Sequence, residues 1–195
     1  MFSEKMRTIA LILLLPILLS CSHDRYLFDP QGNRYQTVTI GEQVWMAANL
    51  RYDVGDGTYC YDDDPLQCEA MGRLYTWSAA LAAADQIPGW HLPSREEWEE
   101  LIAFCGPDSA GYRKLISPAT EFDPQWSGVR TSAAEFKAGD FKPGGFRGVN
   151  HWSSSTSDTN TALAYSVALL DHLQMIGPHN YPKVNACSVR LLKDR

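Results

Sequence analysis

The chain has 195 residues, 45% of them hydrophobic, and a formal net charge of −6 at pH 7. Domains that bind nucleic acids carry clustered Lys and Arg side chains, and this acidic sequence contains no such cluster. A nucleic-acid partner is therefore not expected.

The first 21 residues have the organisation of an export signal. Lys5 and Arg7 precede an apolar run over residues 9–19, which is shorter than the ~20 residues that a membrane-spanning helix needs. The run ends in Leu-Leu-Ser-Cys, which is similar to a bacterial lipobox. We predict a lipoprotein signal peptide over residues 1–20 and lipidation of Cys21. The alternative is an ordinary signal peptide that leaves Cys21 as a free thiol.

These features predict a protein of the bacterial cell envelope that contacts the membrane through a lipid anchor. An Asp directly after the lipidated cysteine would favour retention in the inner membrane, but this chain has Ser22 there. The outer membrane is therefore favoured, and the sequence does not show which face of it carries the protein. Residues 21–27 are expected to form a short tether. Residues 28–195 are expected to form a single domain, because their number suits one hydrophobic core.

Turn-forming residues divide the start of this domain into short elements. Residues 35–46 contain two β-rich runs separated by Gly41-Glu42, and a glycine first in a two-residue turn indicates a type II′ hairpin. A strand is expected over residues 72–77. An alanine-rich helix should follow over residues 78–85, with Ser78 as its N-cap.

The segment GWHLPSREEWEEL concentrates polar side chains that suggest either catalysis or the start of a helix. Ser94 and Glu97 have the spacing of a capping box. Trp98 and Cys105 then share one face of an amphipathic helix. A catalytic site formed by His91, Ser94 and Glu97 is the alternative. Because capping already accounts for two of these three residues, we expect the segment to be structural.

Four cysteines follow Cys21, and an even number in an exported chain indicates two disulfides, although the sequence permits three pairings. Cys60 and Cys68 flank a turn-rich stretch and are expected to pair, which leaves Cys105 with Cys187. The helical stripe predicts that Cys105 faces a core, and strand alternation predicts the same for Cys187. A zinc site is the alternative, but no CxxC or close Cys–His pair supports it.

Residues 106–160 are rich in Gly, Pro, Ser and Thr but are punctuated by aromatic residues. A structureless loop of this length is uncommon in a compact domain, so we expect a long folded excursion. Closing strands are predicted over residues 164–170, 173–176 and 187–192.

Six segments of the chain together resemble one bacterial family, the Fibrobacter succinogenes major paralogous domain. They are FDPQGNRYQTVTIGEQVWMAANL, YCYDDDPLQCEAMGRLYTWSAA, PGWHLPSREEWEEL, PGGFRG, HWSSSTSD and SVRLLKD. This family looks like a branch of the C-type-lectin-like fold, which also includes the formylglycine-generating type of sulfatase modifier. The resemblance implies an α+β fold with a mostly antiparallel small sheet in which the termini meet. It also implies two flanking helices and a long irregular loop region that carries ligand contacts.

The chain departs from the family pattern at three positions. Ala48 stands where the family commonly has Glu, and Ile87 and Leu191 stand where it commonly has two cysteines. The joint loss of those cysteines is what we expect if a bridge between Cys105 and Cys187 replaces theirs.

The resemblance favours a non-catalytic surface binding or adhesion module for a glycan or a protein. The candidate ligand-binding residues are Trp126, Trp152, Phe146 and Arg147, and Trp126 is the tryptophan that we expect to be accessible. One alternative is a structural envelope lipoprotein without a discrete ligand. Another is a formylglycine-generating type of oxidase, which needs two reactive cysteines late in the chain, where this chain has Cys187 alone.

No cofactor is expected. The Glu-Pro-Asn, Gln-Pro-Asp and Trp-Asn-Asp motifs of calcium-dependent lectins do not occur. Asp62, Asp63 and Asp64 could offer oxygen ligands to calcium, although a solvated acidic loop is the commoner meaning of such a run.

Overall fold

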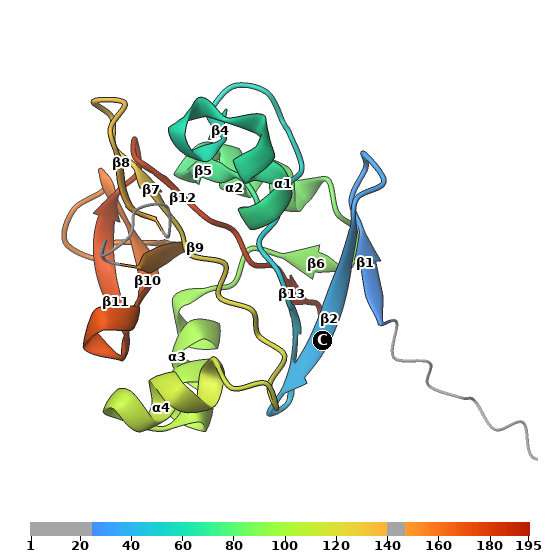
Figure 1. Ribbon diagram of the computed structural model, residues 1–195, viewed down its shortest axis with the longest axis vertical. Coiled ribbons are helices and arrows are strands. Elements are labelled where there is room, and N and C mark those ends of the chain that lie inside the picture. The colour runs from blue at the N-terminus through green and yellow to red at the C-terminus, as the bar shows by residue number, and fades with distance from the viewer. Residues whose placement is uncertain (1–24, 140–146) are drawn as a thin grey trace, which may run out of the picture.

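The strands form two sheets in the computed structural model, which describes residues 25–139 and 147–195 (Figure 1). The first sheet is antiparallel, with the strand order β1-β2-β3-β13-β6. Its strands are β1 (Tyr26–Phe28), β2 (Arg34–Ile40), β3 (Gln43–Met46), β6 (Trp90–His91) and β13 (Leu192–Lys193). Because β13 lies between β3 and β6, both ends of the domain meet in one sheet, as the family resemblance implied.

The second sheet has the order β11-β10-β9-β7-β12-β5-β4, and β8 pairs with β7 at its side. Its pairs are antiparallel except for β7 and β9, which are parallel. The strands are β4 (Thr58–Tyr59), β5 (Leu74–Thr76), β7 (Ser127–Arg130), β8 (Phe136–Gly139), β9 (Gly148–Thr156), β10 (Leu163–Leu170), β11 (Met175–Pro182) and β12 (Ala186–Cys187). The predicted α+β class with mostly antiparallel strands is confirmed, although the strands form two sheets where one small sheet was expected.

The hairpin predicted over residues 35–46 is confirmed as β2 and β3. Gly41 in its turn has a φ of 63°, a conformation that glycine adopts without the steric cost of a Cβ. Strand β1 pairs Tyr26 with Gln36. Regular structure therefore begins within the segment predicted to be a tether.

The described residues contain four α-helices, where two were expected, together with two short 3₁₀ helices. They are η1 (Tyr61–Asp63), α1 (Pro65–Met71), α2 (Trp77–Asp85), α3 (Arg95–Cys105), α4 (Asp108–Leu115) and η2 (Asp171–Leu173). The predicted cap of α2 was wrong by two residues. The helix begins at Trp77, and the Thr76 hydroxyl accepts the N–H of Ala79 at 3.4 Å in place of Ser78.

The capping box at the start of α3 is confirmed. The Ser94 hydroxyl accepts the Glu97 N–H at 3.2 Å, and the Glu97 carboxylate accepts the Ser94 N–H at 2.8 Å. Trp98 and Cys105 both face the interior. The helix therefore delivers its apolar stripe to a core, as the sequence predicted.

The excursion predicted over residues 106–160 is folded in its described parts and supplies α4, β7, β8 and β9. Helices α3 and α4 lie side by side, with α3 against β9 and β10 and α4 against β11 (Figure 1). The expected closing strand over residues 187–192 is split into β12 and β13. The intervening segment leaves the ladder and carries a buried arginine.

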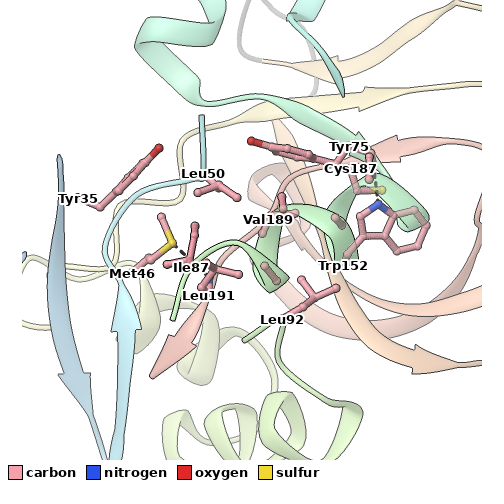
Figure 2. Packing of buried hydrophobic residues seen from close by; sticks show 14 of the residues in the cluster. Tyr35, Met46, Leu50, Tyr75, Ile87, Leu92, Trp152, Cys187, Val189 and Leu191 are labelled. Carbon is pink, nitrogen blue, oxygen red and sulfur yellow. Dashed lines mark hydrogen bonds between the residues drawn. The ribbon is translucent and has the colours of Figure 1, made fainter. Parts of the chain in front are cut away.

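Two hydrophobic clusters form the main core. The first surrounds Trp152 and Tyr75 and includes Leu191 (Figure 2). The second surrounds Trp45 and Trp98, whose ring centroids are 4.6 Å apart, and contains the next residue, Leu192. The end of the chain thus runs between the clusters and contributes to both.

This division explains why one predicted disulfide forms and the other does not. Cys60 and Cys68 are bonded, as predicted. Cys105 and Cys187 are free and buried. Both face a core, but Cys105 belongs to the second cluster and Cys187 to the first (Figure 2). The predicted bridge between them was therefore wrong, and so was the idea that it replaces the family's usual bridge.

Arg190 is completely buried between β12 and β13 and is bound by oxygens from distant parts of the chain. Its Nε donates to the Asn49 side chain at 2.8 Å, and one terminal nitrogen donates to the carbonyls of Met46 and Ala47 at 3.2 and 2.6 Å. The other terminal nitrogen donates to the Asp123 carbonyl. Burial lowers the pKa of Arg190 to about 9, a shift that Asp123 opposes, so the guanidinium is protonated at neutral pH.

Replacing Arg190 with Ala should lower the free energy of unfolding by at least ~3 kcal/mol, because several buried oxygens lose their donor and a cavity remains. Urea unfolding followed by tryptophan fluorescence measures this change. Arg113→Ala is the control, since Arg113 is exposed on α4 and its guanidinium bonds to Gln174 alone among the described residues. This variant should change stability by no more than ~0.5 kcal/mol. Similar losses in the two variants would contradict the structural role of Arg190.

Candidate functional site

Two of the predicted ligand-binding residues, Trp126 and Arg147, lie together on the surface. Trp126 precedes β7 and Arg147 precedes β9, and these two strands are paired. The Arg147 guanidinium carbon is 5.4 Å from the centroid of the Trp126 ring, within the range of a cation–π interaction. The sequence predicted each residue singly, and the pairing of β7 with β9 brings them together.

Two residues that sequence reasoning missed hold Arg147 in place. The Asp171 carboxylate accepts from Arg147 Nε at 2.9 Å and from the Tyr112 hydroxyl at 2.7 Å. Hydrogen bonding to Tyr112 lowers the pKa of Asp171, burial opposes this shift, and Arg147 adds to it. Tyr112 and Asp171 come from α4 and η2, so no local sequence pattern marks them. We call Trp126, Arg147, Asp171 and Tyr112 the Trp126 surface.

The hydrogen bonding of Trp126 differs from that of the core tryptophans. The indole N–H groups of Trp45, Trp77, Trp98 and Trp152 all donate to protein oxygens. The Trp126 N–H has no partner within residues 25–139 and 147–195, and its side chain is only partly buried. Trp126 therefore offers an aromatic surface and an unused donor to a ligand.

The remaining predicted ligand-binding residues do not join this surface. Trp152 is fully buried in the first cluster, and its N–H donates to the Tyr75 carbonyl at 2.7 Å (Figure 2). The prediction that Trp152 contacts a ligand was therefore wrong, because β9 points this side chain into the core. Phe146 lies outside the described residues.

The three aspartates considered as calcium ligands, Asp62, Asp63 and Asp64, do not form a metal site with other residues that the structure describes. Asp64 is the N-cap of α1 and accepts the Leu66 N–H at 3.0 Å. Asp62 and Asp63 lie in η1 with positive φ angles. Across the described ranges, no three His, Cys, Asp or Glu side chains converge as metal ligands.

His91 joins a carboxylate cluster that the sequence showed only in part. Its Nδ1 lies 2.6 Å from Asp194, and its Nε2 lies 3.0 Å from both oxygens of Glu97. Asp194 was missed because it lies at the far end of the chain. Ser94 caps α3, and both ring nitrogens of the histidine are taken up by carboxylates. The arrangement supports the structural interpretation of this segment.

The helices and strands form a small α+β domain, and the Trp126 surface places an aromatic ring beside a cation on its exterior. Residues 38–193 match the Fibrobacter succinogenes major domain (Fib_succ_major), and the chain belongs to this family. No curated protein and no solved structure matches the chain. Among the described residues, no helix is both long and apolar enough to cross a membrane.

The cluster around His91 predicts a pH-dependent contribution to stability. Burial acts to lower the pKa of His91, but the hydrogen bonds to Asp194 and Glu97 outweigh it and raise the pKa. The folded state then holds the proton more tightly than the unfolded chain, in which histidine titrates near pH 6.5. The stabilisation should be complete below about pH 6.5 and disappear as the pH rises through the raised pKa.

The difference in unfolding free energy between the wild type and His91→Gln should therefore be larger at pH 6 than at pH 8.5. Urea titrations at the two pH values measure it. Phe28→Ala provides the control, because this exposed side chain carries no ionisable group, and its difference from the wild type should be the same at both pH values. A wild-type minus His91→Gln difference that is equal at both pH values would show that His91 contributes no such linkage.

Proposed function

We propose that this protein is a non-catalytic binding module of the bacterial cell envelope, anchored by lipid on Cys21, which binds a glycan or a protein through the Trp126 surface. The observation that carries the proposal is the partly exposed Trp126, whose N–H has no partner among the described residues, beside Arg147, which Asp171 holds in place. The leader sequence supports the anchor and the outer membrane.

The chemistry of the Trp126 surface suits recognition of a ligand. Tryptophan, tyrosine and arginine are the residues that most often dominate binding energy at interfaces. Arg147 is held by Asp171, so little side-chain entropy remains to be lost on binding. Its carboxylate partner also leaves the surface without a strong net charge. An uncharged sugar face or an apolar protein side chain therefore fits best against the indole.

The geometry of the cysteines disfavours the oxidase alternative. That chemistry needs exposed, activated thiolates. Cys105 and Cys187 are free but buried in different clusters, and burial raises the pKa of both thiols. A structural envelope lipoprotein without a discrete ligand is the remaining alternative, and the binding experiment separates it from a binding module.

The fragment beginning at Ser22 should be retained on a glycan array or by an envelope protein fraction. Trp126→Ala should weaken retention at least tenfold, about the effect of losing a hot-spot side chain. Phe28→Ala is a matched control, because Phe28 is an exposed aromatic on β1, and it should bind like the wild type. Absence of retention with and without calcium would favour the structural lipoprotein.

The lipid anchor is tested in cells that express the full chain. A clickable palmitate analogue should label the wild type and not Cys21→Ser. The control Cys105→Ser should still be labelled, because it retains Cys21 and the Cys105 that it lacks is buried. Labelling is read on a gel and in the detergent phase of a Triton X-114 partition. Labelling of Cys21→Ser, or none of the wild type, would contradict the anchor.

A further inference from the structure

A second surface feature, separate from the Trp126 surface, lies beside the Cys60–Cys68 disulfide. It is a hollow of about 420 Å³, and its wall includes Arg51, Arg73, Asn33 and Glu69. Ligand pockets generally have ~300–1,000 Å³. The hollow is therefore large enough for one sugar residue, and its lining includes three charged side chains, Arg51, Glu69 and Arg73.

Arg73 is neutralised and fixed by the protein itself. Its terminal nitrogen lies 2.7 Å from the Asp53 carboxylate, and its Nε donates to the Arg51 carbonyl at 3.2 Å. Asp53 in turn accepts the Gly55 N–H at 2.9 Å. This arginine is thus paired with groups of the protein itself and forms part of the wall of the hollow.

Arg51 has no such partner. Within residues 25–139 and 147–195 its guanidinium forms no salt bridge or hydrogen bond, and its guanidinium carbon lies 5.8 Å from the centroid of the Tyr35 ring. The Nε is buried without an acceptor, and the residue as a whole is partly exposed. An arginine left unpaired at a pocket wall, in a chain with a net charge of −6, is a ready partner for an oxyanion, which guanidinium groups bind bidentately.

The other lining groups define which oxyanion fits. The Asn33 side chain donates to Asp29 at 2.8 Å, which leaves its carbonyl oxygen unused, and the Glu69 carboxylate has no hydrogen bond within the described residues. These two acceptors can receive hydroxyl donors. Glu69 also repels additional negative charge, which favours a monovalent carboxylate over a phosphate dianion.

We propose that this hollow binds the carboxylate-bearing sugar residue of an acidic glycan, with Arg51 pairing the carboxylate and Asn33 and Glu69 accepting from ring hydroxyls. The inference deepens the proposed glycan-binding function and rests on it, but it uses a different set of residues. Loss of binding at one site can therefore be distinguished from loss at the other.

The test compares methyl glucuronide with the neutral methyl glucoside by calorimetric titration of the full chain. The glucuronide should bind at least tenfold more tightly, as expected for a hydrogen-bonded charge pair, and Arg51→Gln should abolish the difference. Arg130→Gln is the matched control, since Arg130 is also stacked on an aromatic ring, Tyr59, with a buried and unpaired Nε but does not line the hollow. Trp126→Ala should leave glucuronide binding unchanged.

Three results would overturn the inference: equal binding of the two glycosides, glucuronide binding unaffected by Arg51→Gln, or tighter binding of inorganic phosphate or N-acetylalanine than of the glucuronide. If Arg51→Gln does not fold, amide NMR of the wild type decides the matter. Glucuronide-induced shifts centred on Asn33, Arg51 and Glu69 support the site, and shifts centred elsewhere overturn it.

Discussion

The buried Arg190 guanidinium is the interaction on which the rest of the structure depends. A charged group taken out of water must find oxygens within hydrogen-bond reach, and Arg190 finds them on β3, on Asn49 and on the segment before β7. It also lies 4.2 Å from the centroid of the Phe122 ring. The requirement to satisfy one cation thus positions the N-terminal sheet, the closing strand and the loop that leads to Trp126.

This constraint shapes the surface as well as the core. The Asp123 carbonyl accepts a hydrogen bond from Arg190. Trp126 lies only three residues after Asp123, so the same network positions its indole. Two other arginines show how the environment determines the role of a guanidinium. Arg147 is immobilised by Asp171 beside an aromatic ring, whereas Arg51 lines a hollow and has no anionic partner in the part of the chain that the structure describes. The first is suited to positioning a stacking surface and the second to pairing with a ligand.

The polar segment at the start of α3 shows how local chemistry is absorbed by the fold. Ser94 and Glu97 cap the helix, and Glu97 also bonds to His91, which reaches Asp194 beside β13. Residues that resemble part of an active site in the sequence therefore link α3 to the C-terminal strand β13. The same helix carries Cys105 to the second cluster, away from Cys187 in the first.

The sequence by itself determined the elements whose causes are local: the β2–β3 hairpin at Gly41, the capping box at Ser94 and the short Cys60–Cys68 loop. Each depends on residues a few positions apart, so pattern and spacing suffice. Only the tertiary structure decided that Trp152 is core, that Cys105 and Cys187 lie in separate clusters, and that Asp171 holds Arg147. Those outcomes depend on which strands pair and on which of the two hydrophobic clusters each side chain joins. No local pattern encodes either of these.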